Sequence, residues 1–312
     1  MDVEGNIIQS IDQRNKTLQI TLGYSCNNNC SFCTEDRNNR AAKKNTPIEF
    51  YKKIIKDSAK KFKTIIFTHG EPTLNKNLPE LIRYAKEFSY PRISLVTNGR
   101  MLSYKSFCSK LAKSGLNEIC FSVHGHNPEL HDNLTRSPGS FKQACMGMAN
   151  IQRFRKKGII KQFTIHATIV KQNYKFLKEM YGFFNSFGPD RIIFNMFNPK
   201  NADSKKIDSH MAKYSDIVNV IKGFYFRGES NFVLIDFPSC TAGDMIHNMG
   251  SISDSHIKEL NCETKCKEFK RAALEGKIKL KDCGKCKFGS VCPGISEEYI
   301  KKFGTGEFKP VK

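Results

Sequence analysis

The stretch Cys26-Asn27-Asn28-Asn29-Cys30-Ser31-Phe32-Cys33 has three residues between its first two cysteines and two between its last two. It follows an apolar run at 18–24, so we expect a loop directly after a first strand. Three thiolates can hold three corners of a cubane iron-sulfur cluster, whereas a fully protein-ligated cluster takes four. The fourth iron is then open to another ligand. A zinc knuckle or a set of buried thiols is also compatible with this spacing.

This stretch resembles the signature of the radical S-adenosylmethionine (radical SAM) superfamily, C-x3-C-x2-C with an aromatic residue, here Phe32, before the last cysteine. The resemblance implies that Cys26, Cys30 and Cys33 ligate a 4Fe-4S cluster whose open iron chelates SAM. It also implies reductive cleavage of SAM to a 5'-deoxyadenosyl radical, which abstracts hydrogen from a substrate.

Beyond this loop, apolar runs alternate with amphipathic segments. We expect strands at 18–24, 64–68, 93–97, 118–123, 163–170 and 191–197, and helices at 47–61, 78–88, 104–113, 141–156, 174–187 and within 206–222. Such alternation favours an α/β fold with a parallel sheet and helical crossovers. Six units match the partial (βα)6 TIM-like barrel that the resemblance implies. We predict a radical SAM core at 1–226 and a small cysteine-rich C-terminal extension at 227–312.

The loops after the strands of a parallel barrel carry chemistry. After the second predicted strand, His69-Gly70-Glu71-Pro72 resembles the family's Gly-Gly-Glu-Pro element, with His69 in place of the first glycine. That element approaches the SAM amino group. The resemblance implies that the other SAM-binding positions are Phe32, Thr97, Asn98, Ser122, Arg136, Asn195 and Met196.

The segment after the fourth predicted strand contains His124, His126, His131 and Arg136, which are our candidates for catalytic residues. Three histidines can form a zinc site, but we prefer polar loop residues that orient one another and the substrate. One of them can act as a general acid or base, because histidine titrates near neutral pH. Arg136 can pair with the SAM carboxylate or with a substrate anion. We interpret His166, within the fifth strand, as a core histidine.

The C-terminal cysteines resemble the SPASM and Twitch extensions of radical SAM enzymes. The family's C-x2-C-x5-C is present, but Ser296 stands where its next cysteine is expected. The resemblance implies one auxiliary 4Fe-4S cluster, for which our ligand set is Cys240, Cys283, Cys286 and Cys292. Cys262 and Cys266 can replace some of these ligands or be free thiols. A zinc ribbon of Cys262, Cys266, Cys283 and Cys286 is the alternative.

Composition limits the class of protein. The chain has 312 residues, 39% of them hydrophobic, which indicates a folded protein. The N-terminus lacks the pattern of a signal peptide and no segment suits a membrane span, so we expect a cytoplasmic protein. In that compartment, twelve cysteines indicate metal or redox chemistry more than disulfides. The formal charge of +21 reflects either a lysine-rich surface or an anionic partner.

Three functional hypotheses follow. The first is a radical SAM enzyme that modifies a peptide or protein side chain and takes its electron from a donor such as flavodoxin or ferredoxin. The short segment before the first strand argues against a separate leader-recognition domain. The second is modification of RNA, a nucleotide or a small molecule, motivated by the positive charge. The third is a metal-stabilised RNA-binding protein without catalysis.

Overall fold

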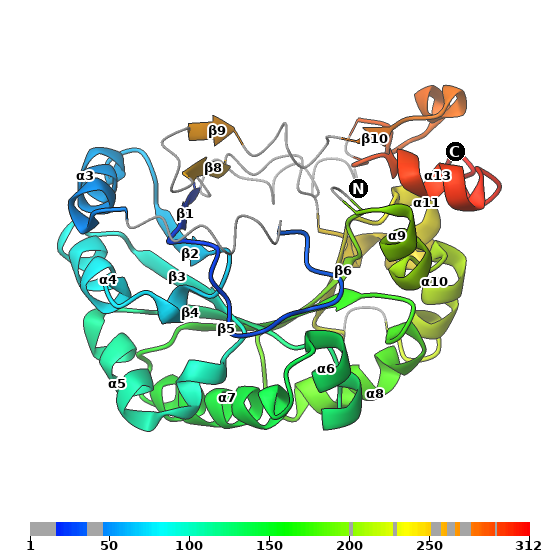
Figure 1. The fold of residues 1–312 in the computed structure, drawn as a ribbon. Helices are drawn as coiled ribbons and strands as arrows, with labels where there is room; N and C mark the ends of the chain where they lie inside the picture. Colours follow the sequence, from blue (N-terminus) through cyan, green and yellow to red (C-terminus); the bar gives the residue numbers. More distant parts are fainter. Residues whose placement is uncertain are drawn as a thin grey trace.

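A curved sheet lies at the centre of the chain, with helices along its outer face (Figure 1). The computed structural model describes residues 17–35, 46–199, 202–226, 230–250, 257–260, 266–268, 276–290 and 292–312. The sheet has nine strands in the order β7-β6-β5-β4-β3-β2-β1-β8-β9. Each of β1 to β6 pairs in parallel with the next strand along the chain. The predicted α/β partial barrel is therefore confirmed.

The seven parallel strands are β1 Thr17–Thr21, β2 Thr64–Thr68, β3 Arg92–Thr97, β4 Glu118–Ser122, β5 Gln162–Ile169, β6 Arg191–Met196 and β7 Phe232–Ile235. The helices between them are α3 Ile48–Ser58, η2 Pro72–Leu74, α4 Leu78–Glu87, η3 Arg100–Ser103, α5 Lys105–Ser114, α6 Pro128–Thr135, α7 Ser140–Lys156, η4 Tyr174–Phe176, α8 Leu177–Asn185, α9 Ser204–His210 and α10 Tyr214–Lys222.

The sequence pattern explains why these segments pack in this way. In β2, Ile65 and Phe67 are both 0% exposed, and they point into the layer between the sheet and its helices. In α4, the residues that repeat at helical spacing, Leu78, Leu81 and Ile82, are also fully buried. Burial of apolar area of this kind is the main stabilising contribution to such a fold.

The structure differs from our prediction in three elements. A seventh parallel strand, β7, follows residue 226, where we expected the alternation to stop. The predicted helix within 206–222 is two helices, because the chain is extended at Met211 and Lys213. We did not predict α6, whose start is capped by the Asn127 side chain accepting from the Leu130 amide.

The rest of the chain consists of short elements. They are α11 Ser239–Ala242, η5 Gly243–Asn248, β8 Ile257–Leu260, β9 Cys266–Glu268, β10 Lys277–Ile278, η6 Lys281–Lys285, β11 Ile295–Ser296 and α13 Glu297–Phe303. β8 pairs in parallel with β1, and β9 is antiparallel to β8. The boundary between 226 and 227 stays a prediction. No helix in the described ranges is long and apolar enough to cross a membrane.

Candidate active site

The segment from Cys26 to Cys33, called here the cluster loop, follows β1 and is held by backbone hydrogen bonds from α6. The amides of Asn29 and Ser31 donate to the carbonyls of Thr135 and Leu134, both at 2.9 Å. These carbonyls belong to the last turn of α6, where a helix has no internal partners for them. The unpredicted helix therefore fixes the path of the loop between its cysteines.

The turn after β2 packs directly on the start of this loop. Gly70 has a φ of 53°, and a Cβ there would lie 2.7 Å from the carbonyl oxygens of Gly23 and Ser25. Only glycine fits this close approach. His69 also has a positive φ of 64°, and its Nδ1 lies 3.0 Å from the Thr21 Oγ1. The histidine that replaces the family's first glycine is thus hydrogen-bonded to β1.

Glu71 is buried and joins two of the predicted SAM-binding turns. Its Oε1 accepts hydrogen bonds from the Thr73 amide at 3.1 Å and the Thr97 hydroxyl at 2.7 Å. Its Oε2 accepts from the Asn98 amide at 2.7 Å. Burial raises the pKa of the Glu71 carboxyl, while the hydrogen bonds act in the opposite direction. The Glu71 carboxylate therefore stabilises the turn at Thr97 and Asn98 by hydrogen bonds within the protein.

A cavity of ≈ 340 Å³, called here the central cavity, opens at the carboxyl ends of the strands. Most of the predicted site residues line it together: Cys26, Cys30, Phe32, Cys33, His69, Gly70, Glu71, Thr97, Asn98, Ser122, His124, Asn195 and Met196. Pro72 does not line it; it is buried at the start of η2. The spatial gathering of residues from five separate strand ends follows from the parallel sheet.

The residues of the central cavity fit the groups that the resemblance implies. The buried Asn195 Oδ1 has no hydrogen-bond partner among the described residues, so it is available to a polar ligand. Within the described ranges, no three His, Cys, Asp or Glu side chains converge tightly enough for a single metal ion. A cubane cluster differs, because it binds each thiolate at a separate iron.

The histidines after β4 divide between the core and the surface. The His124 Nδ1 accepts from the Thr168 amide, and the His131 Nδ1 accepts from the His124 amide, both at 3.1 Å. Burial lowers the pKa of His124 well below its ordinary value and that of His131 to about 4. His126 and Arg136 line a different, outer groove. Within the described ranges these three histidines do not converge on a single point, and of the three only His124 lines the central cavity.

The sequence prediction missed several residues of the cavity wall: Asn28, Thr34, Glu35, Thr68, Val96, Thr168 and Asn198. His166, which we interpreted as a core histidine, also lines the cavity, although burial lowers its pKa to about 4. His166 and Thr168 are two residues apart on β5 and so share one face of the strand. The alternation of side chains along β5 could therefore have predicted that His166 and Thr168 face the central cavity together.

Arg100, also unpredicted, braces the cluster loop from η3. Its guanidinium donates to the Asn27 carbonyl and, at 3.1 Å, to the Asn28 Oδ1. Asn98 adds a side-chain hydrogen bond to the Asn27 Oδ1 at 2.7 Å, and its Nδ2 lies 3.8 Å from the Cys26 Sγ. A charged donor and an amide donor thus hold Asn27 and Asn28, which follow the first cysteine of the loop.

A second set of cysteines meets near the C-terminus. Cys240, Cys283, Cys286 and Cys292 line one cavity of ≈ 230 Å³. The amides of Ser239 and Gly294 point at the Cys292 Sγ at 3.4 and 3.5 Å. Cys262 lies outside the described residues. Cys266 begins β9, and its side chain is not described. The four cysteines of our predicted auxiliary ligand set are therefore neighbours.

The sequence matches the radical SAM superfamily over residues 20–184, more than half of the chain. A probable GTP 3',8-cyclase from Sulfolobus acidocaldarius is 26% identical over 196 residues, covering 62% of this chain and 60% of that protein. An AdoMet-dependent heme synthase from Oleidesulfovibrio alaskensis is 30% identical over 124 residues, covering 40% and 30%. The chain thus spans less than two thirds of the length of these curated relatives.

Two solved structures share the fold along most of the chain. SuiB of Streptococcus suis bound to precursor peptide SuiA superposes with a TM-score of 0.65 at 16% identity, covering 96% of this chain and 76% of that one. Native anSMEcpe with bound AdoMet superposes with a TM-score of 0.68 at 15% identity, covering 90% of this chain and 89% of that one.

The chain therefore belongs to the radical SAM superfamily. It is a radical SAM enzyme, and the family implies a 4Fe-4S cluster and SAM as its cofactors. The hypothesis of a non-catalytic RNA-binding protein is not retained.

Proposed function

We propose that this enzyme abstracts hydrogen from a peptide or protein side chain. The observation that carries the proposal is a second cavity of ≈ 300 Å³ that shares Met196 and Asn198 with the central cavity. It continues toward the C-terminal region, where its wall includes Asp236, Lys277 and Glu297. Two joined cavities suit an extended chain better than a compact small molecule.

In this proposal Cys26, Cys30 and Cys33 hold the cluster, and the Asn195 amide contacts SAM. When bound, the cluster and SAM supply a 5'-deoxyadenosyl radical that abstracts hydrogen. The protein orients both partners and excludes water from them. Phe32 is 7% exposed and packs edge-on against the His124 ring, with the two ring centroids 4.7 Å apart. It closes one side of the central cavity.

The charged lining of the second cavity suits a peptide backbone with mixed side chains. Lys277 pairs with Asp236 there, and both side chains are largely buried. Asp236 has a φ of 65°, a conformation that costs energy for a residue with a Cβ. Its carbonyl accepts from the Tyr214 hydroxyl at 3.1 Å, which holds the turn in place. The Lys277 ammonium group is a hydrogen-bond donor and the Asp236 carboxylate an acceptor for a peptide that lies in the second cavity.

We also propose that Cys240, Cys283, Cys286 and Cys292 hold one auxiliary 4Fe-4S cluster. Burial raises the pKa of the Cys240 thiol to about 11, so the thiolate needs a bound cation to form at neutral pH. The amides that point at Cys292 are of the kind that tune iron-sulfur sites.

SuiB and anSMEcpe, which share this fold, have each been solved with a peptide bound.

A deuterium transfer experiment tests the substrate class. The reconstituted, dithionite-reduced enzyme is incubated with SAM and a perdeuterated mixture of short peptides. The proposal predicts deuterium in the 5'-deoxyadenosine, detected by mass spectrometry, and none with Cys30→Ala. Formation of 5'-deoxyadenosine without deuterium from any peptide would count against a peptide substrate and leave the radical chemistry intact.

A nucleotide is the second candidate, because several sequence relatives are named as probable GTP 3',8-cyclases. The formal charge of +21 is also favourable for an anionic substrate. Ribose-deuterated GTP in the same assay distinguishes the two candidates. Transfer from GTP, and not from the peptides, would replace the first proposal with the second.

A further inference from the structure

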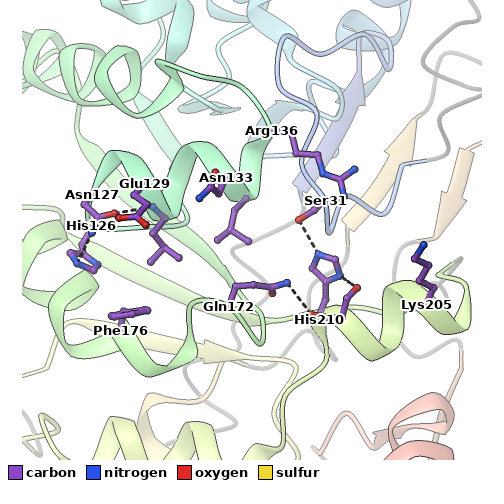
Figure 2. A pocket seen from close by; sticks show the side chains of 13 residues that line it. Ser31, His126, Asn127, Glu129, Asn133, Arg136, Gln172, Phe176, Lys205 and His210 are labelled. Atoms are coloured by element: carbon purple, nitrogen blue, oxygen red, sulfur yellow. Dashed lines mark hydrogen bonds between the residues drawn. The ribbon is translucent and has the colours of Figure 1, made fainter.

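A surface groove of ≈ 660 Å³ lies between α6 and α9, and Figure 2 shows it from close by. We call it the α6–α9 groove; its lining is Ser31, His126, Asn127, Glu129, Leu130, Asn133, Leu134, Arg136, Gln172, Phe176, Lys205, Ser209 and His210. Ser31 of the cluster loop faces this groove, whereas its neighbours Cys30, Phe32 and Cys33 face the central cavity. None of the described residues lines both. The cluster loop is therefore a thin wall between them.

This wall decides what kind of ligand the groove can serve. Hydrogen abstraction needs direct contact between the reacting atoms, and a molecule in the groove has the cluster loop between itself and the central cavity. Much of the lining is also exposed, Phe176 to 42%, so a small molecule would be poorly covered. Electron transfer has no such requirement, because an electron can cross a few bonds without atomic contact.

Two contacts from α9 connect the groove to the loop. The His210 Nε2 lies 2.9 Å from the Ser31 Oγ, and Lys206 Nζ donates to the Cys33 carbonyl. His210 is only 5% exposed. The Lys171 amide donates a hydrogen bond of 2.7 Å to the His210 backbone carbonyl and so fixes this residue in place. A protein seated on the groove would therefore contact the cluster loop directly at Ser31, which the His210 hydrogen bond holds in place.

The charge of this region selects the partner. Figure 2 shows Arg136 next to Ser31 and Lys205 beside His210, and both side chains are exposed. The acidic Glu129 lies at the other end of the groove. Leu130, Leu134 and Phe176 add apolar side chains to the lining, and Figure 2 shows Phe176 at the same end as Glu129. Exposed basic residues beside apolar side chains fit a partner with an acidic surface.

We propose that the α6–α9 groove is the docking surface for the acidic one-electron carrier protein that reduces this enzyme. One electron leaves the carrier, which is oxidised by one electron, and enters the cluster behind the loop, which is reduced by one; no bond or proton changes hands. The positive charge of the whole chain, +21, adds long-range steering for such a partner. The inference rests on the cluster site proposed above.

A binding experiment tests the groove directly. Affinity for a purified bacterial flavodoxin is measured at low salt by isothermal titration calorimetry for the reconstituted wild type, Lys205→Glu, Glu129→Gln and Lys113→Glu. Lys205→Glu is expected to weaken binding about tenfold, and Glu129→Gln to tighten it about twofold. Lys113, exposed on α5, makes the same charge change elsewhere and is expected to have less than a twofold effect. Circular dichroism and iron content confirm that each variant is folded.

The reduction rate gives an independent measurement. For each variant, the flavodoxin-driven rate of 5'-deoxyadenosine formation is divided by its dithionite-driven rate, because dithionite needs no docking surface. The ratio should fall about tenfold for Lys205→Glu alone. Equal effects of Lys205→Glu and Lys113→Glu, or weaker peptide or RNA binding with flavodoxin affinity unchanged, would overturn the docking proposal. Failure of the wild type with dithionite would instead overturn the cluster site.

Discussion

The cluster loop and the C-terminal cysteine site both bring cysteines together but are held in different ways. The cluster loop is tied to α6 by two backbone hydrogen bonds, to η3 by Arg100 and to the turn after β3 by Asn98. Cys240, Cys283, Cys286 and Cys292 come instead from short elements, among them the four-residue α11 and the five-residue η6. The barrel thus shapes its own loop, whereas we expect the second site to depend on its metal for order.

The largest difference is expected in SAM cleavage. Cys30→Ala should reduce 5'-deoxyadenosine formation to the level of a sample without protein, because it removes one of the three cluster ligands. Cys286→Ala changes only the second site and should retain measurable cleavage of SAM. Anaerobic chromatography of the products with dithionite as reductant gives both values. Equal loss in the two variants would mean that the sites are not separable.

Metal content is expected to change next. The reconstituted wild type should hold about eight irons, and Cys283→Ala combined with Cys286→Ala should hold about four, by counting two 4Fe-4S clusters. Iron and acid-labile sulfide are measured together with zinc. Zinc at the second site of the wild type would disprove an auxiliary iron-sulfur cluster and favour a stabilising metal.

Glu71→Gln should weaken the support of the turn beside the cluster loop, because it removes the carboxylate that accepts hydrogen bonds from Thr97 and Asn98. A glutamine amide group would face a backbone N–H that now donates to the carboxylate, which leaves a buried donor without an acceptor. We expect a loss of roughly 1–3 kcal/mol in the free energy of unfolding, measured with urea. Glu87→Gln, at an exposed position on α4, is the control and should change stability by less than about 0.5 kcal/mol. Similar values for both variants would contradict the bracing role.

The last predicted effect is on acid stability of the barrel. The pKa values of His131 and His166 are lowered to about 4 in the folded chain, from an ordinary value of 6.5. The unfolded chain therefore binds protons that the folded chain excludes, and stability falls as the pH drops from 6.5 toward 4. Each histidine contributes up to about 1.4 kcal/mol per pH unit.

The measurement compares urea midpoints at pH 7.5 and 5.5 for the wild type and for His166→Gln. The wild type should lose more stability between these values than the variant, because the variant lacks one of the histidines whose pKa is lowered in the folded chain. An identical loss would show that His166 does not resist protonation in the folded chain.

Features with local causes were predictable from the sequence. The spacing of Cys26, Cys30 and Cys33 predicts a loop of metal-binding type, and the apolar runs of strands such as β2 predict a parallel sheet. The positions of residues on successive strand ends then follow from the geometry of that sheet.

Features that depend on distant contacts were not predictable. The role of Glu71 as a brace arises from Thr97 and Asn98, which are 26 and 27 residues away. The support of the cluster loop by Lys206 arises across 173 residues. The separation of Arg136 from the central cavity likewise depends on how α6 packs, and no local pattern encodes it. Tertiary packing decides such positions after the local elements form.

The pairing of β7 with β6 and of β8 with β1 has a consequence for any shortened form of this chain. A protein that ended at residue 226 would retain β1 to β6, but both outer strands would present rows of unsatisfied backbone N–H and C=O groups to solvent. Exposed edge strands recruit other chains and promote aggregation. The C-terminal segment therefore also works as a protective cover for the barrel, and its removal should cost solubility before it costs chemistry.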